Sequence, residues 1–250
     1  MRLRIAPEVL ALFPAALVGV VRVRGCDNAN TASLANTEIE ALLRRAEAAA
    51  RTALGALAGG ALAQEPRIAC WREAYRQFGA SPKKSPSSVE SLLRRVAGGE
   101  LLRSINPLVD LYNAVSLERL LPAGGEDLAQ VRGDIVLCRA GEAEPPVRLL
   151  GDAEARPPHP GEVIYRDDVA AICRRWNWRE ADRTKLTAAT RDAVLVLEAL
   201  PPTGRADLEQ ALADLAGRIT RCCGGEAHTA VLDVATAELD LGVADQEPAP

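Results

Sequence analysis

The feature that most constrains the fold is a change of hydrophobic pattern at Gly124-Gly125. Before this point apolar residues recur at the spacing of amphipathic helices, whereas after it they form short runs separated by proline-rich turns. One valine-rich run before the change, residues 17–23, is typical of a buried strand. Helices followed by strands, around one initial strand, predict an α+β fold in which helices flank a mixed β-sheet.

The same pattern predicts the individual elements. Helices are expected over 39–57, 66–79, 89–96 and 206–220, and from Asn106-Pro107, where Asn caps the helix and Pro suits its first turn. Strands are expected over 134–138, 147–150, 162–165, 169–173, 193–200 and 229–234. No linker-like composition divides the chain, so we expect one domain over residues 1–236 and an acidic, disordered tail over 237–250.

Charge is distributed unevenly along the chain, although the net charge is only -4. From Arg67 to Arg103 there are eight basic and three acidic residues, whereas from Glu198 to the C-terminus there are three arginines and ten acids. This distribution is consistent with local contact to phosphate, and the net charge argues against a general nucleic-acid binder.

Several classes of protein are not favoured. The six cysteines have neither zinc-ribbon nor disulfide-framework spacing, which predicts reduced thiols and a cytoplasmic location. The apolar run 9–21 weakly resembles a signal peptide, but it follows Glu8, contains Pro14 and is too short to span a bilayer. With only His159 and His228, and without phosphate-loop or dinucleotide motifs, we expect no metal, cofactor or membrane contact.

The first candidate for chemistry is the start of the helix at Asn106. Asn106, Asp110 and Asn113 lie along one stripe of that helix. As structural residues, Asn106 is a cap and Asp110 a first-turn charge favoured by the helix dipole. Asn113 is harder to explain in this way, because Asn inside a helix usually needs a specific partner.

The second candidate is the segment 174–185, which holds two of the three tryptophans among five basic residues. Arginine binds phosphate, and indole rings stack on bases or on amino-acid side chains. Glu180 and Asp182 can either hold the arginines or contact a substrate amine. A strand-to-loop connection with solvated charges is the structural alternative. The substrate contacts expected here are Trp176, Asn177, Trp178 and Thr184, and the phosphate contacts are Arg175, Arg179, Arg183 and Lys185.

Two further candidates are weaker. Glu162 opens a predicted strand and either points into a cleft, as a base or substrate anchor, or remains an exposed edge charge. Lys83 and Lys84, together with Arg72 and Arg76, fit a phosphate-facing patch, although a solvated surface gives the same pattern.

Five motifs carry a family resemblance. They are Trp71-Arg-Glu-Ala-Tyr-Arg-Gln-Phe-Gly, Ile105-Asn-Pro-Leu-Val-Asp-Leu-Tyr-Asn-Ala-Val-Ser-Leu117, Gly133-Asp-Ile-Val, Gly161-Glu-Val-Ile-Tyr and Arg175-Trp-Asn-Trp-Arg-Glu-Ala-Asp-Arg-Thr-Lys-Leu-Thr187. Over roughly residues 15–220 the chain resembles free-standing proteins whose domain is similar to the tRNA-editing domain of the phenylalanyl-tRNA synthetase beta subunit, its third and fourth modules.

The resemblance implies a cleft between helices and a mixed sheet. Asp110 and Asn113 match the Asp-x-x-Asn helix motif of the synthetase, whose Asn lines the editing pocket. Two departures stand out. The stretch 122–127 lacks the histidine of the synthetase's Pro-Leu-His-Ala-Phe-Asp, and the segment 176–179 replaces a Gly-Gly-containing loop.

The function implied by the resemblance is hydrolysis of a mischarged aminoacyl ester at the tRNA 3′ end. Such an ester needs a positioned water, donors for the developing oxyanion and a pocket for the amino acid. We expect Asn113 to hold the carbonyl or the water, Glu162 or Asp182 to anchor the amine, and a ribose hydroxyl to help carry the proton. Two alternatives remain open: a non-catalytic RNA-binding module, and an enzyme or sensor for an amino-acid derivative.

Overall fold

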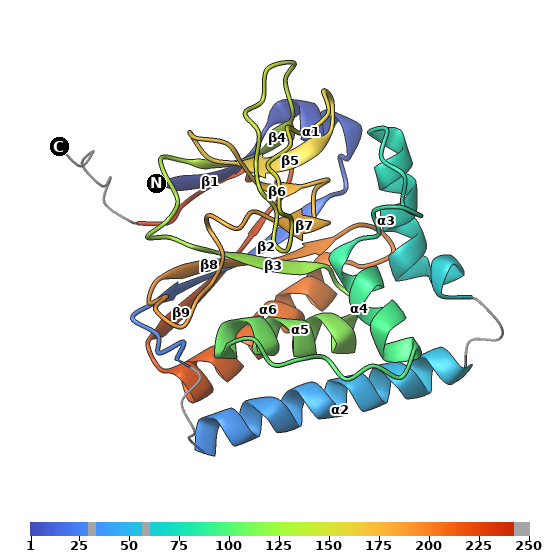
Figure 1. The fold of residues 1–250 in the computed structure, drawn as a ribbon, viewed down its shortest axis with the longest axis vertical. Helices are drawn as coiled ribbons and strands as arrows, with labels where there is room; N and C mark the ends of the chain where they lie inside the picture. Colours follow the sequence, from blue (N-terminus) through green and yellow to red (C-terminus); the bar gives the residue numbers. More distant parts are fainter. Residues whose placement is uncertain (30–33, 57–60, 243–250) are drawn as a thin grey trace.

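The computed structural model describes residues 1–29, 34–56 and 61–242 of the chain. The predicted α+β class is confirmed, with the strands arranged in two sheets (Figure 1). In spatial order, one sheet contains β10 (Glu238–Asp240), β1 (Arg2–Ile5), β4 (Ile135–Arg139), β5 (Val163–Arg166), β6 (Ala171–Arg174) and β7 (Arg179–Glu180). The other contains β3 (Ala123–Asp127), β8 (Ala193–Ala199), β2 (Leu17–Arg24) and β9 (Glu226–Leu232).

The first sheet is mixed, because β1 and β4 are parallel while its other pairs are antiparallel. The second sheet is antiparallel throughout. The helices of the described residues are α1 (Pro7–Leu12), α2 (Leu34–Ala56), α3 (Pro66–Gln77), α4 (Ser88–Ala97), α5 (Pro107–Arg119) and α6 (Arg205–Cys223), with a short 3-10 helix at Ala61–Gln64.

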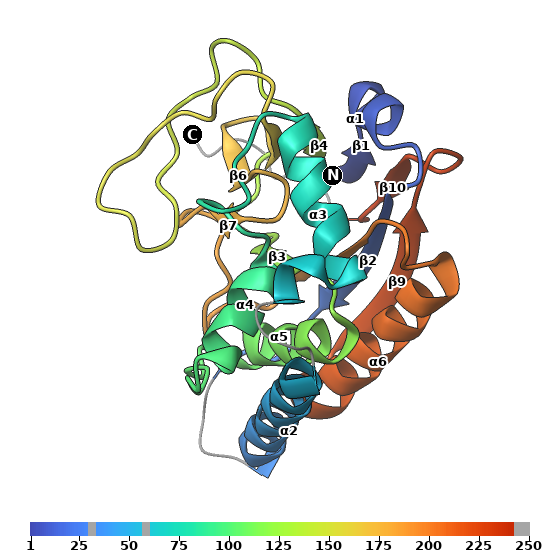
Figure 2. The same cartoon turned by 90° about the vertical axis from the view of Figure 1, so that its right-hand side faces the viewer.

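The four-stranded sheet separates two layers of packing. Helices α5 and α6 pack on one of its faces, α2 packs outside them, and the six-stranded sheet lies across the other face (Figure 1). Figure 2 shows the same layers from the side, with α5 between α2 and β3. Helix α6 approaches closely because Gly19 has no side chain: a Cβ there would lie 2.8 Å from Leu212 Cδ1.

Strand β8 shows how alternation divides the core. Leu195 and Leu197 pack with the helices, whereas Val194 and Val196 pack in the cluster shared with the six-stranded sheet. Glu198 lies on the same face of β8 as Val194 and Val196, toward the six-stranded sheet, and is buried. A carboxyl is therefore held between two sheets, a placement that calls for polar partners.

Several predicted boundaries need correction. Residues 9–21, which weakly resemble a signal peptide, are divided between α1 and β2. The strand predicted over 147–150 is replaced by two isolated bridges, from Val147 to Arg156 and from Leu149 to Ala181. The predicted disordered tail begins with β10, which pairs with β1, so regular structure extends past residue 236. Residues 243–250 of that tail, and residue 57 at the end of a predicted helix, lie outside the described residues.

None of the helices in the described ranges is long and apolar enough to cross a membrane. Within the same ranges, His, Cys, Asp and Glu side chains form no group of three or more that is placed to hold a metal ion.

Candidate functional site

A cavity of about 420 Å³ lies between the two sheets and is bounded by α4 and α5. This volume falls in the range of small-ligand sites. Strand β8 contributes the side chains that face the six-stranded sheet, and β3 contributes its glycines. The lining is mostly apolar, with Leu3, Val109, Ile135, Ile172, Val194 and Val196 among the apolar residues and Tyr112, Tyr165, Trp176 and Trp178 among the aromatic ones.

A hydrogen-bond network crosses one wall of this cavity. Tyr165 donates its hydroxyl to Glu198 Oε1 at 2.5 Å, and Asn177 Nδ2 donates to Glu198 Oε2 at 2.8 Å. The Tyr75 hydroxyl in turn donates to Asn177 Oδ1 at 2.8 Å. Burial raises the pKa of Glu198 to about 7, and these hydrogen bonds act in the opposite direction. The network therefore holds a carboxyl that can change its charge near neutral pH.

A second polar feature lies where β3 meets β7. The backbone N–H of Gly125 donates to Glu180 Oε1 at 2.8 Å, and Glu126, the next residue of β3, also lines the cavity. Burial raises the pKa of Glu180 to about 7. Burial and then the charge of Glu180 raise the pKa of Glu126 well above its ordinary value. Gly124 permits this arrangement, since a Cβ there would lie 2.7 Å from Glu180 Oε1.

The turn between β6 and β7 places two indoles in the wall. Arg175 and Trp176 have φ angles of 50° and 65°, a left-handed conformation that costs free energy for residues with a side chain. The conformation puts Trp176 in the core, with its ring centroid 5.1 Å from that of Trp71 and nearly perpendicular to it. Trp178 remains partly exposed, with the Arg175 guanidinium 4.2 Å and that of Arg179 5.3 Å from its ring centroid.

Comparison with protein families shows which family this chain belongs to. The B3/4 domain, which is found in the phenylalanyl-tRNA synthetase beta subunit, matches residues 70–239. The chain belongs to the B3/4 domain family. The matched residues include α5, β3, the β6–β7 turn and β8, which together supply most of the cavity wall. No curated protein matches the chain. B3/4 membership relates the chain to a nucleic-acid-binding module of a tRNA synthetase.

Five of the residues predicted from the sequence line the cavity of this B3/4 domain. Asn113 projects from α5 and is partly exposed, and the other four belong to the β6–β7 turn and its exit: Trp176, Asn177, Trp178 and Arg179. Asn177 has both ends of its amide occupied, by Tyr75 and Glu198, so it positions Glu198.

Glu162, predicted to be catalytic, does not line the cavity. It is buried and accepts from Arg174 Nε and Nη2 at 2.9 and 2.8 Å, and from the backbone N–H groups of Arg175 and His159. A carboxylate with four such donors is structural in this fold, because nothing further is needed to satisfy it.

The amide of Asn106 and the carboxyl of Asp110, at the start of α5, likewise form hydrogen bonds within the fold. Asn106 caps the helix by accepting from Val109 N–H at 3.1 Å, and it donates to Leu186 O at 3.2 Å. Asp110 accepts from the Ser104 hydroxyl and from Ile105 N–H. Burial nevertheless raises the pKa of Asp110. Neither side chain lines the cavity, and the structural interpretation holds for both.

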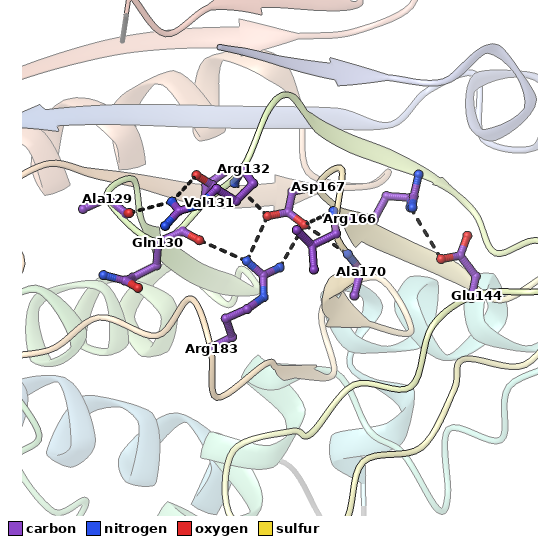
Figure 3. A network of polar contacts seen from close by, with 10 residues as sticks. Ala129, Gln130, Val131, Arg132, Glu144, Arg166, Asp167, Ala170 and Arg183 are labelled. Atoms are coloured by element: carbon purple, nitrogen blue, oxygen red, sulfur yellow. Dashed lines mark hydrogen bonds and ion pairs between the residues drawn. The ribbon is translucent and has the colours of Figure 1, made fainter. Parts of the chain in front are cut away.

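Most of the predicted phosphate-binding cations are paired within the fold. Arg183 donates to both oxygens of the buried Asp167 and to Gln130 O, which ties the chain after β7 to the β5–β6 turn (Figure 3). Lys185 pairs with Asp182 at 2.6 Å, and Arg179 pairs with Asp152 at 2.8 Å.

The remaining residues of that segment are also engaged. Hydrogen bonding by Lys185 and the nearby charge of Arg148 lower the pKa of Asp182, which does not line the cavity. Arg175 donates to the Ser85 hydroxyl. Thr184 is buried beside Glu126, also outside the lining, and its hydroxyl lowers the pKa of that carboxyl.

Lys83 and Lys84 differ from these cations, because both are exposed and no ion pair to either is found in the described part of the chain. The loop that carries them is anchored at the β6–β7 turn, where Ser88 N–H donates to Asn177 O at 2.8 Å. Ser88 itself lines the cavity. The two lysines are therefore the cations of the predicted patch that are best placed for an external anion.

Two lining carboxyls, those of Glu126 and Glu198, were not singled out from the sequence, and a third, Glu180, was considered only as an alternative to Asp182 for holding an arginine or contacting an amine. A sequence signal existed for Glu198, because a single acid inside the apolar run 193–200 has to find polar partners when the strand is buried. Glu126 follows two glycines and has no comparable local signal. Its place in the cavity depends on the pairing of β3 with β8.

Proposed function

We propose that this B3/4 protein hydrolyses the ester of an aminoacylated tRNA 3′ end, with the amino acid bound in the cavity between the two sheets. The observation that carries the proposal is Asn113. The Asn of the Asp-x-x-Asn helix lines a cavity of small-ligand size within the part of the chain that matches the family.

The cavity offers what ester hydrolysis requires. Asn113 is partly exposed in the wall, so its amide can donate to the ester carbonyl or hold the attacking water. The ester is already activated, so correct placement of the reactants supplies much of the rate. The ribose hydroxyl next to the ester can carry the proton to the leaving oxygen. No histidine is needed for these steps.

The walls suit an amino-acid side chain with a polar group. Trp176, Trp178 and Ile172 provide an apolar surface, and Glu198 provides a carboxyl at one wall. Because Tyr165 and Asn177 fix the orientation of Glu198, a ligand group that hydrogen-bonds to it is placed in one geometry.

The exposed Lys83 and Lys84 are the residues proposed to bind the phosphates of the tRNA. Their loop leads into α4 at Ser88, a residue of the cavity wall, so phosphates bound there lie close to the ester. Arg179, at the exit of the β6–β7 turn, is a further candidate, although it already pairs with Asp152.

The test is release of amino acid from a panel of tRNAs, each mischarged with a different amino acid. We expect release from at least one member and a loss of about a hundredfold in Asn113→Ala, the size typical of removing one donor to a developing oxyanion. The control Gln77→Ala changes an exposed residue of α3 and leaves the rate unchanged. If no member of the panel loses its amino acid at high protein concentration, the deacylase proposal is wrong.

A second candidate is an enzyme or sensor for a free amino-acid derivative. The observation that favours it is the internal pairing of Arg179, Arg183 and Lys185, which leaves few cations for RNA. It requires binding of the free derivative with tRNA absent. A third outcome, salt-sensitive tRNA binding with no hydrolysis, corresponds to a non-catalytic RNA-binding module.

A further inference from the structure

Two carboxyl groups from different sheets meet in the cavity wall. Glu126 belongs to β3 of the four-stranded sheet, and Glu180 ends β7 of the six-stranded sheet. The Gly125 N–H, on the residue next to Glu126, donates to Glu180 Oε1 at 2.8 Å, and the charge of Glu180 raises the pKa of Glu126, so both carboxyls belong to one part of the cavity wall. Both acids lie on strands, so neither caps a helix, and neither forms an ion pair within the described residues.

Neither carboxyl of this pair forms an ion pair within the described residues, although the Thr184 hydroxyl and the charge of Arg183 lower the pKa of Glu126. Glu126 is 7% exposed, and its Oε2 has no hydrogen-bond partner in the described residues. The lining cations are directed elsewhere: Arg95 pairs with Glu100 and Arg179 with Asp152. Glu126 is buried and Glu180 half-buried, and two such carboxylates without a cation repel each other, so they are expected to share a proton until a cation arrives.

Arg183 illustrates why the site remains open. Its charge lowers the pKa of Glu126. Its guanidinium, however, donates to both oxygens of Asp167 and to Gln130 O (Figure 3). With these bonds made, Arg183 has no ion pair with Glu126 or Glu180 in the described structure.

We propose that Glu126 and Glu180 form a binding site for a primary ammonium group of the ligand. An ammonium carries three donors and a compact charge, which match two lining carboxyls, Glu126 and Glu180, that have no ion pair among the described residues. On binding, the shared proton leaves to solvent and the ammonium takes its place. The inference rests on the proposed function and sharpens it, because the substrate is then an amino acid with a free amine, and an N-acylated ester is excluded.

The ammonium of such a ligand can be the α-amine or that of a basic side chain. Four amides separate the two sources: norleucinamide has the α-amine alone, Nα-acetyl-lysinamide the side-chain amine alone, lysinamide both, and Nα-acetyl-norleucinamide neither. Binding of each to the full chain is measured by calorimetry with tRNA absent. We expect the amide without an amine to bind at least about tenfold more weakly than the better of the two single-amine amides.

The variants Glu126→Gln and Glu180→Gln remove one negative charge each while keeping the shape of the side chain. Each should weaken binding of the preferred amine by about tenfold or more, the size of a charge-assisted hydrogen bond. The control Glu73→Gln removes an exposed acid of α3 and leaves binding unchanged. Thermal unfolding of each variant shows whether the fold is retained.

The pH dependence gives a readout that a structural role does not move. Burial raises the pKa of Glu180 to about 7, so affinity for the ammonium should rise from pH 5.5 to 7 and this rise should be lost in Glu180→Gln. The other groups around the pair are Tyr112 and Cys173, whose pKa values are raised well above the ordinary ones, together with the paired Arg183 and Asp167 and, across the cavity, Glu198.

The outcomes distinguish this inference from the proposed function. Binding of an amine without ester hydrolysis keeps the ammonium site and removes the deacylase. Equal hydrolysis of aminoacyl-tRNA and its N-acetylated form keeps the deacylase and overturns the ammonium site. The site is also overturned if all four amides bind equally, or if none binds at a concentration on the order of 20 millimolar. It is likewise overturned if the pH dependence of binding is removed only by Glu198→Gln.

Discussion

Two carboxylate sites, one at Glu162 and one formed by Glu126 and Glu180, have opposite surroundings. Glu162 is held by Arg174 through two hydrogen bonds of 2.9 and 2.8 Å. Glu126 and Glu180 have no arginine partner, and one oxygen of Glu126 has no hydrogen-bond partner among the described residues. The first site is complete within the fold, whereas the second has a deficit of positive charge that a ligand can supply.

The difference shows that burial alone does not identify a functional acid. Both Glu162 and Glu126 are more than nine-tenths buried. What separates them is whether the surrounding chain neutralises the charge and fills the hydrogen-bonding capacity. Glu162 supports the β6–β7 turn by accepting from Arg174 and from Arg175 N–H. It does not line the cavity itself, but the turn that it supports positions the two tryptophans that do.

The largest expected effect comes from breaking the complete site. Glu162→Ala leaves the Arg174 guanidinium buried without a partner, so the free energy of unfolding should fall by about 3–5 kcal/mol. Urea denaturation monitored by tryptophan fluorescence measures this loss. Glu154→Ala, in an exposed ion pair with Arg156, is the matched control and should change stability by less than about 0.5 kcal/mol.

The same measurement on Glu180→Ala tests the other side of the comparison. Removing an uncompensated carboxyl relieves its repulsion with Glu126, so the loss of stability should stay below about 1 kcal/mol. Equal losses in Glu162→Ala and Glu180→Ala would contradict the distinction between a complete and an incomplete site.

The sequence predicted local features better than the partners of charged residues. The cap at Asn106 and the strands 17–23 and 193–200 follow from spacing and composition, and the structure has them within a residue or so of the expected bounds. Glu162 was expected in a cleft because its strand was visible but its partner was not. The pairing with Arg174 depends on the neighbouring strands β5 and β6, a tertiary arrangement.

The cavity itself illustrates the same limit. Glu180 was considered as a contact for a substrate amine, yet Asp182, two residues away, was chosen as catalytic. Nothing local separates them. Glu180 ends β7 and accepts from Gly125, 55 residues earlier, whereas Asp182 follows the strand and pairs with Lys185. The long-range pairing of β3 decides which acid faces the cavity.

Glu198 sharpens the comparison, because it has hydrogen-bond donors but no cation. Its pKa rises from 4.5 to about 7 on folding, so the folded chain binds more protons than the unfolded chain between these values. The free energy of unfolding contributed by this group is therefore fully present below pH 4.5 and falls by about 3 kcal/mol as the pH rises to 7. Glu198→Gln should remove that part of the slope.

Urea denaturation of the wild type and of Glu198→Gln at several pH values between 4.5 and 8 measures the difference. The Glu180→Gln curve serves as a comparison, since burial raises that pKa in the same direction. Parallel curves for wild type and Glu198→Gln would mean that Tyr165 and Asn177 already compensate the charge, which would place Glu198 with Glu162 among the complete sites.

The smallest expected effect on stability comes from Gly124→Ala, which tests whether the open site depends on a close approach. Gly124 does not have a positive φ, so alanine is not strained there by the backbone. Its Cβ would lie 2.7 Å from Glu180 Oε1, and the flexible carboxyl moves away and loses the Gly125 N–H. Stability should change by less than about 1 kcal/mol, while ammonium binding weakens several-fold.

Gly217→Ala is the matched control, because a Cβ at this exposed helical position meets nothing within 4 Å. It should stabilise the chain by up to about 1 kcal/mol through helix propensity and leave ammonium binding unchanged. Calorimetry with the preferred amide and urea denaturation give the two numbers for both variants. Unchanged binding in Gly124→Ala would mean that the ammonium contacts Glu126 without needing Glu180 in its present position, so the site would then depend on one carboxyl of β3.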